Sequence, residues 1–108
     1  MASLSTHILD TSLGRPAEGV SISLATIEGQ ELGGGTTDAD GRIGQIGPAE
    51  LEPGDYVLTF ATGDYYRASG QEGFYPTASI AFTVAAGEKH YHVPLLLNPW
   101  GYSTYRGS

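Results

Sequence analysis

Three histidines, His7, His90 and His92, are the side chains of this sequence best suited to moving protons. Imidazole is the side chain whose ordinary pKa lies closest to neutral pH, which makes it the commonest general acid or base. The sequence contains no cysteine, which excludes a disulfide scaffold, a thiolate nucleophile and a cysteine zinc site. Acid–base chemistry on imidazole is therefore the first hypothesis.

One residue separates His90 from His92, and two such residues point to the same face of an extended strand. Three interpretations follow from this spacing. The pair could cap turns or face solvent, which is the commonest role of histidines on strands. It could perform acid–base work without a metal, or it could join His7 in a three-imidazole zinc site. His7 lies on the more polar face of its strand, which favours a cleft that is open to water.

Arg42 follows directly after the turn sequence Asp38-Ala-Asp-Gly41. Aspartate and glycine at these positions are typical of a tight turn, so Arg42 lies where that turn ends. Its guanidinium group could clamp a carbonyl or carboxylate group of a ligand. The alternative is a solvated charge at the end of a strand, which is the commoner role of an isolated arginine.

Alternation of apolar and polar residues is the dominant pattern, and it predicts strands. In the first strand, Leu4, Thr6 and Ile8 share one face, and Ser3, Ser5 and His7 share the other. Further strands are predicted over residues 20–25, 31–37, 56–61, 79–84, 89–97 and 101–105. Pro94 should fall at an edge or a bulge. One short helix is predicted over residues 63–70.

Chain length, composition and net charge limit the folds and the binding partners that the protein can have. A chain of 108 residues with 16 glycines and 6 prolines predicts a single domain, residues 1–108, with many turns and little helix. Seven to eight short strands are typical of an all-β sandwich. A net charge of −7 argues against nucleic acid as a partner.

The sequence shows no targeting signal. Its first residues form no secretory signal, and no apolar run approaches the about 18 residues of a membrane span. We expect a soluble cytoplasmic protein with no membrane partner.

Strand-forming residues continue almost to the last position, from Tyr102 to Tyr105. Chain ends usually fray unless something holds them. We therefore expect this end to pack into a site or a subunit contact.

Four separated motifs resemble the transthyretin-like proteins. They are Ser5-Thr-His-Ile-Leu-Asp10 with Gly14-Arg-Pro-Ala17, then Thr37-Asp-Ala-Asp-Gly-Arg42, then His90-Tyr-His-Val-Pro-Leu-Leu-Leu97, and finally Gly101-Tyr-Ser-Thr-Tyr-Arg-Gly-Ser108. The last two resemble the 5-hydroxyisourate hydrolase branch of the family. The ending Tyr105-Arg-Gly-Ser108 distinguishes that branch from the hormone-carrying transthyretins.

The resemblance implies a role for each matched residue. His7 and His92 correspond to the two catalytic histidines, and Arg42 to the substrate-binding arginine. His90 matches no catalytic position. Ser108 corresponds to a terminal serine that shapes the catalytic site, and the supporting segment that also contacts substrate consists of Tyr105, Arg106 and Gly107.

The resemblance also implies a fold and a reaction. The fold would be a transthyretin-like β-sandwich of two four-stranded antiparallel sheets with one short helix. The protein would be a homotetramer, a dimer of dimers with sites at the interface between the dimers. It would open the ring of 5-hydroxyisourate, in urate degradation, to 2-oxo-4-hydroxy-4-carboxy-5-ureidoimidazoline. Water assisted by histidine would attack a ring carbonyl, with no metal or other cofactor.

Two alternatives belong to other functional classes. A transthyretin-type carrier would share the sandwich and the tetramer but would lack His7, His92 and the Tyr-Arg-Gly-Ser ending. A zinc hydrolase would use His7, His90 and His92 as ligands. Such an enzyme would lose its activity to a chelator and regain it with zinc.

Overall fold

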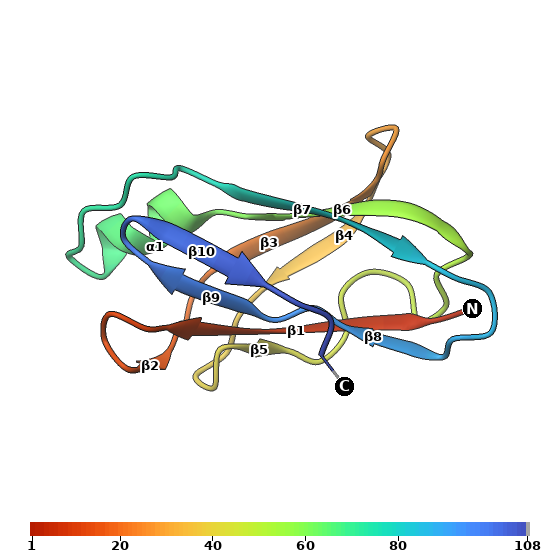
Figure 1. The fold of residues 1–108 in the computed structure, drawn as a ribbon, viewed down its shortest axis with the longest axis horizontal. Helices are drawn as coiled ribbons and strands as arrows, with labels where there is room; N and C mark the ends of the chain where they lie inside the picture. The colour runs from red at the N-terminus through yellow and green to blue at the C-terminus, as the bar shows by residue number, and fades with distance from the viewer. Residues whose placement is uncertain (108) are drawn as a thin grey trace.

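Two β-sheets face each other in the computed structural model, which describes residues 1–107, and one short helix lies at one end (Figure 1). This confirms the predicted mostly-β fold with two sheets and a single helix. The core is one cluster of apolar side chains between the sheets, with Leu4 and Ile8 from the first strand and Leu24, Leu58 and Phe60 from the facing sheet. Leu4 and Ile8 come from the face of the first strand that the alternation grouped together.

One sheet has four strands in the order β4-β3-β6-β7, and every pairing in it is antiparallel. The predicted strands agree with the observed ones to within two residues at each end. The bounds are β3 Ser21–Thr26, β4 Glu31–Thr36, β6 Gly54–Phe60 and β7 Ala78–Val84.

The other sheet is built around β1, Ser3–Asp10. One edge of β1 carries two short antiparallel strands, and the other edge carries two strands that run parallel to it. The six strands therefore occupy four positions side by side. These are the two short antiparallel strands, β1, the two parallel strands, and a last strand that pairs antiparallel with the second parallel strand. The remaining bounds are β2 Arg15–Pro16, β5 Arg42–Ile43, β8 His90–His92, β9 Leu95–Asn98 and β10 Gly101–Thr104.

The prediction that both sheets are purely antiparallel is wrong for the sheet of β1. The chain reaches β8 by crossing over from β7 in the facing sheet, so it enters beside β1 in the same direction. A crossover of this kind produces parallel neighbours, whereas a hairpin produces antiparallel ones.

The predicted strand 89–97 is interrupted in the middle. Val93 and Pro94 separate β8 from β9, because proline has no N–H to give to a ladder. The carbonyls there bond to side chains: Thr6 Oγ1 donates to Val93 O at 2.6 Å, and Thr104 Oγ1 donates to Pro94 O at 2.7 Å. The break is consistent with the expected irregularity at Pro94.

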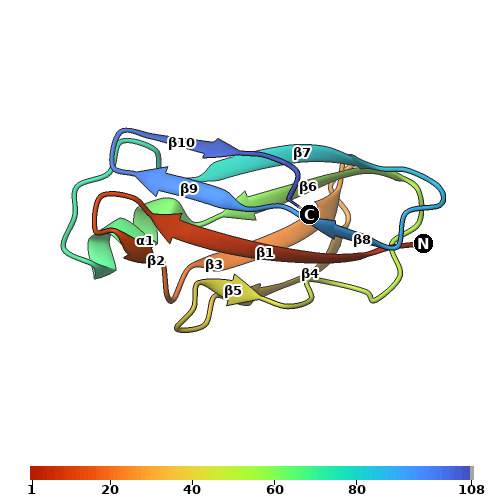
Figure 2. The same cartoon turned by 60° about the horizontal axis from the view of Figure 1, so that its bottom comes forward.

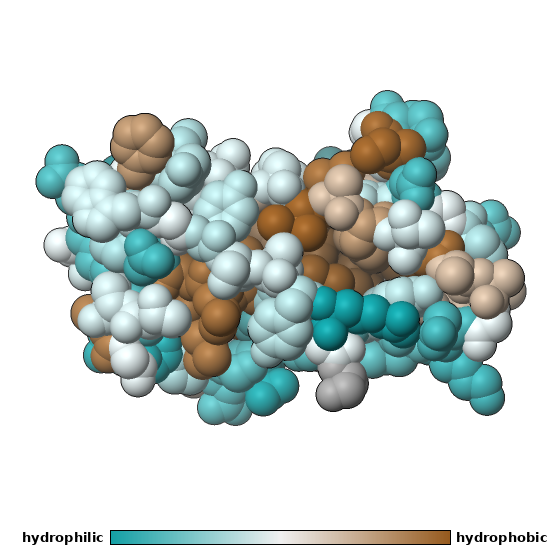
Figure 3. Space-filling model, in the orientation of Figure 1, coloured by the Kyte–Doolittle hydropathy of each residue, from teal (hydrophilic) through white to brown (hydrophobic). Residues whose placement is uncertain are grey.

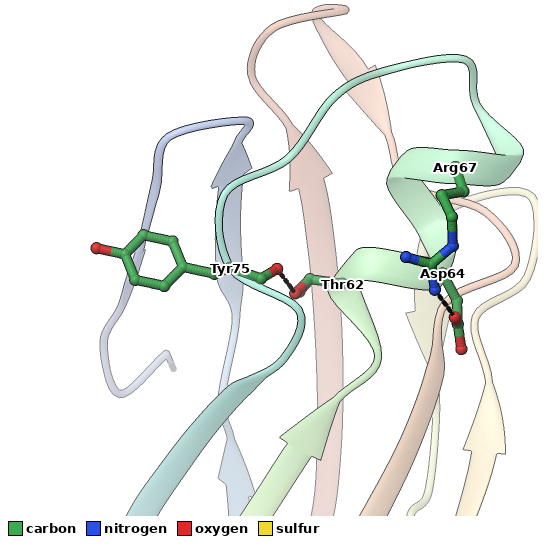
Figure 4. A network of polar contacts seen from close by, with 4 residues as sticks. All are labelled: Thr62, Asp64, Arg67 and Tyr75. Carbon is green, nitrogen blue, oxygen red and sulfur yellow. Dashed lines mark hydrogen bonds and ion pairs between the residues drawn. The ribbon is translucent and has the colours of Figure 1, made fainter.

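The helix α1, Thr62–Ala68, begins and ends slightly before the predicted bounds. Thr62 Oγ1 donates to Tyr75 O at 2.9 Å, and Asp64 pairs with Arg67 one turn later (Figure 4). Tyr65 and Tyr66 are buried and attach the helix to the core. No helix in the described residues is long and apolar enough to cross a bilayer.

Candidate active site

The first, fifth and eighth strands run side by side and bring the predicted site residues together (Figure 2). His7 on β1 is the direct partner of Arg42 on β5, and Ser5 on β1 is the direct partner of His92 on β8. Directly paired residues point to the same face of a sheet, and Ser5 and His7 share a face because they are two positions apart. His7, Arg42 and His92 therefore meet on the outer face of one sheet.

A tight turn sets the position of Arg42. The Asp38 carboxylate accepts hydrogen bonds from the backbone N–H groups of Asp40 at 2.9 Å and Arg42 at 3.0 Å. Gly41 has a φ of +73°, and a Cβ at this position would lie 2.4 Å from the carbonyl oxygen of Ile8. Only glycine lets the turn pack this closely against β1. The turn predicted from the sequence thus carries Arg42 to the strand of His7.

Two serines of β1 connect the histidine pair of β8. Ser5 Oγ lies 2.8 Å from Nδ1 of His92 and 2.9 Å from Nε2 of His90. Ser3 Oγ lies 2.7 Å from Nδ1 of His90. The ring of His92 is half-buried, whereas His90 is exposed. Both nitrogens of His90 are therefore engaged by hydroxyls, and Nδ1 of His92 is engaged as well.

An open, largely polar pocket of about 290 Å³ lies over these groups. Its size is close to the lower limit for a small-molecule site. His7 does not line it but lies beside it, opposite Arg42 in the strand register. The lining residues are Ser5, Thr6, Arg42, Ile43, Gly44, His90 and His92.

The pKa of His92 is lowered from its ordinary value of 6.5. Burial of the ring is the largest cause, followed by the positive charge of Arg42 and by the nearby rings of His7 and His90. All of these oppose a second proton on the imidazole. His92 is thus held in its neutral form near neutral pH, as a general base requires.

The end of the described chain returns to His92. The backbone N–H of Gly107 donates to the carbonyl of His92 at 2.8 Å. A Cβ at position 107 would lie 2.6 Å from Cδ2 of the His92 ring. The glycine of the C-terminal motif therefore packs directly against the imidazole.

The side chains of Tyr105 and Arg106 lie elsewhere. They line a separate apolar groove of about 300 Å³ with Ile80 and Phe82 of β7, and apolar surface is visible between β7 and β10 in Figure 3. Arg106 stacks over the Tyr91 ring at 4.4 Å and pairs with Glu88 at 3.3 Å. The structure does not bring these two side chains to the histidine pocket of the same chain. The remaining predicted residue, Ser108, lies outside the described residues.

Sequence reasoning missed Ser5, and the resemblance matched His90 to no catalytic position. The signal was present in the alternation, which placed Ser3, Ser5 and His7 on one face of the first strand. The alternation does not show which strand lies beside β1 and which of its side chains share that face. The parallel register that puts Ser5 beside His92 depends on the crossover between the sheets.

Within residues 1–107, no three His, Cys, Asp or Glu side chains are arranged to hold a metal ion. Serine hydroxyls occupy three of the four ring nitrogens of His90 and His92. The geometry therefore offers no ligand set for the zinc alternative.

Known proteins of closely similar sequence share this fold. The chain is 44% identical over 111 residues to the 5-hydroxyisourate hydrolase of Mus musculus, and the alignment covers 97% of this chain and 94% of the relative. The structure of Klebsiella pneumoniae 5-hydroxyisourate hydrolase superposes with a TM-score of 0.92 at 46% identity, covering 100% of this chain and 94% of that one. Sea bream transthyretin in complex with thyroxine matches at 32% identity with a TM-score of 0.87, covering 96% of this chain and 93% of that one.

The match also holds at the level of the whole family. The sequence pattern of the HIUase/Transthyretin family covers residues 4–107, which include β1, the turn before Arg42, and β8. Together with the identities over nearly the full chain, this shows that the protein belongs to the HIUase/Transthyretin family.

Proposed function

We propose that the protein is an enzyme that hydrolyses 5-hydroxyisourate in urate degradation. The observation that supports this most strongly is that Arg42 and His92 line one pocket with His7 beside Arg42, in a chain 44% identical to a hydrolase of that name. The product is 2-oxo-4-hydroxy-4-carboxy-5-ureidoimidazoline.

The substrate suits the pocket chemically. 5-Hydroxyisourate is planar and carries several carbonyl and N–H groups, so it needs hydrogen-bonding partners more than an apolar cavity. Arg42 offers a planar fork of N–H donors that can hold carbonyl oxygens and favour negative charge as it develops on them. The pocket is small, shallow and largely polar.

In the proposed reaction, water attacks a ring carbonyl while His92 removes one of its protons through Nε2. Nδ1 of His92 faces Ser5 at 2.8 Å, which leaves Nε2 for the substrate side. A C–O bond forms, the ring C–N bond breaks, and the ring nitrogen receives a proton. His7, beside Arg42 in the register, is the second imidazole that orients the water or returns that proton.

We also propose that the working form is a homotetramer, a dimer of dimers. The open pocket of a single chain supports this, because a second subunit could cover it and exclude water. The exposed Tyr105 would then contact a neighbouring subunit together with Arg106. Sizing chromatography with light scattering tests this assembly.

The test of function is to generate 5-hydroxyisourate in place with urate oxidase and to follow its ultraviolet decay. We expect this protein to accelerate the decay, with the same rate after treatment with a strong chelator. No acceleration would leave the carrier function, and loss on chelation with recovery on zinc would favour the zinc hydrolase.

A further inference from the structure

Ser5 is the only residue in the described chain that bonds both histidines of β8. A serine hydroxyl has one proton and two lone pairs, so it donates in at most one of its two hydrogen bonds to these rings. A neutral imidazole likewise has one N–H and one acceptor nitrogen. When Ser5 donates in one of these bonds and accepts in the other, they couple the protonation of His92 to that of His90.

Two neutral arrangements satisfy both bonds with the hydroxyl proton of Ser5 lying in one of them. In the first, His92 donates from Nδ1 to Ser5, and Ser5 donates to Nε2 of His90. In the second, both directions are reversed, and His92 carries its proton on Nε2. The first arrangement leaves the lone pair of Nε2 free to act as a base, and the second does not. The first arrangement becomes the second when Nε2 of His92 gains a proton, the protons in the two bonds shift toward His90, and Nδ1 of His90 loses its proton.

The proposed hydrolysis requires such a movement. Opening a ring at a carbonyl yields a carboxylate and an N–H group. Of the two protons of the attacking water, one ends on the ring nitrogen and the other must leave the site. Keeping this proton on the His92 ring is unfavourable, because burial and the positive charge of Arg42 lower the pKa of the ring. His90 is exposed and can pass a proton to water.

We propose that Ser5 is a relay between the two histidines, carrying the released proton from His92 to His90 and from there to solvent. This rests on the proposed function. The proton enters at Nε2 of His92, and the Nδ1 proton of His92 passes to Ser5 Oγ as the hydroxyl proton of Ser5 passes to Nε2 of His90. The positive charge then lies on His90. Its Nδ1 proton passes to Ser3 Oγ, 2.7 Å away, as Ser3 gives its own hydroxyl proton to water.

The kinetic test replaces Ser5 by alanine. We expect kcat for Ser5→Ala to fall about 10- to 100-fold, by analogy with the loss of a hydrogen-bond partner that orients a metal-binding histidine, with KM little changed. Added imidazole buffer at constant ionic strength should restore part of the rate, because it can take the proton directly from His92. His90→Asn should show the same buffer dependence with a smaller loss. The wild type and Ser21→Ala, a change at an exposed serine on β3, should show none.

The outcomes separate a relay from simple orientation. A Ser5→Ala variant with wild-type kcat would overturn the proposal. A variant that loses kcat but gains nothing from buffer would show that Ser5 only orients His92, which also overturns the relay. A His90→Asn variant whose rate is independent of buffer would exclude His90 as the exit.

A second measurement needs no substrate. Nitrogen-15 NMR distinguishes protons on Nδ1 and Nε2 of a neutral histidine, and the balance at His92 should change between wild type and Ser5→Ala. An unchanged balance would contradict the coupling. If the wild type fails to act on 5-hydroxyisourate while this balance does change, the function fails and the coupling of the two histidines stands.

Discussion

The first strand carries polar groups into two very different surroundings. At its end, the Asp10 carboxylate is fully buried, and it accepts hydrogen bonds from Ser12, Leu13, Tyr65 and Gln71. Three to five residues earlier, Ser5 and His7 lie half-buried on the opposite face beside an open pocket. The strand thus separates a closed polar network from an open one.

The two networks act on proton affinity in different ways. Burial by itself raises the pKa of Asp10, but the hydrogen bonds outweigh it and lower the pKa below the ordinary value of 3.8. Burial and the neighbouring carboxylate raise the pKa of Tyr65. At His92, burial and the charge of Arg42 act in the same direction, and both lower the pKa.

The position of a polar group on β1 decides whether it stabilises the fold or serves the pocket. Asp10 holds the helix to the sheet because Tyr65 of α1 donates to it at 2.6 Å. A group whose hydrogen bonds are all taken has none left for a ligand. On the histidine face, by contrast, His92 and Arg42 line the pocket. We expect changes in the first network to alter stability, and changes in the second to alter turnover.

The largest expected effect is the loss of the proposed base. His92→Asn should reduce turnover by at least ~10²-fold, the low end for removing a general acid or base. His90→Asn should be far milder, because its ring lies at the exposed end of the pair. The ultraviolet decay assay on folded variants measures both, and equal losses at the two positions would contradict the assignment.

A change that only displaces His92 comes next. In Gly107→Ala the new Cβ would meet the ring at 2.6 Å, so the imidazole must shift, and small errors in position can cost about 10²-fold in rate. The matched control is Gly101→Ala, where the nearest atom is Asn98 Nδ2 at 3.9 Å. If both variants keep full turnover, the C-terminal segment does not position the base.

Arg42→Lys tests the shape of the cation. Lysine keeps the charge but loses the planar fork, so turnover should fall about tenfold, less than the 10²–10³-fold expected when a charge-stabilising donor is lost entirely. Steady-state kinetics on the purified variant give the value. A fully active lysine variant would mean that position 42 supplies only its charge.

Asp10→Asn should lower stability and leave turnover unchanged, the reverse of what we expect for changes at the histidine face. The new amide N–H group faces donors from Tyr65 and Gln71, so the free energy of unfolding should fall by about 1–3 kcal/mol. Turnover at a temperature where the variant is folded should stay near that of the wild type. Urea denaturation and the decay assay measure the two quantities, and a specific loss of turnover would remove the distinction between the networks.

The smallest expected effect is on the pH dependence of kcat/KM and on the titration of His92. Because the pKa of His92 lies below 6.5, the base stays neutral down to a lower pH, and kcat/KM should fall only as pH drops through that lowered pKa. Arg42→Gln removes a positive charge, so the NMR titration midpoint of His92 should move upward, while burial keeps it below the ordinary value. A midpoint that does not move would mean that Arg42 does not act on His92.

Much of the fold could be predicted from local sequence. Alternation in the first strand gave its buried face correctly, and the Asp-Ala-Asp-Gly turn placed Arg42 at a strand end because both features depend on nearby residues. The two-residue strands β2 and β5 were missed, since so short a pattern carries no periodicity. The parallel neighbours of β1 depend on a crossover between sheets, which no local pattern records.

The site could be predicted only in part for the same reason. Resemblance to the family supplied His7, Arg42 and His92, which the structure brings together. Ser5 and His90 required the register, because their partnership joins strands distant in sequence. The placement of Tyr105 and Arg106 outside the pocket depends on the path of the chain after β10.

The parallel pairing of β1 with β8 has a consequence for biosynthesis. Ser3 and Ser5 meet their histidine partners across 87 positions of sequence, so the ribosome makes β1 several seconds before β8 at about 5–20 residues per second. Until then β1 has no neighbour on that edge, and such distant pairings form slowly. The histidine pair is therefore assembled among the last parts of the molecule. A nascent chain released before β8 emerges would carry Arg42 and His7 without His92, the proposed base.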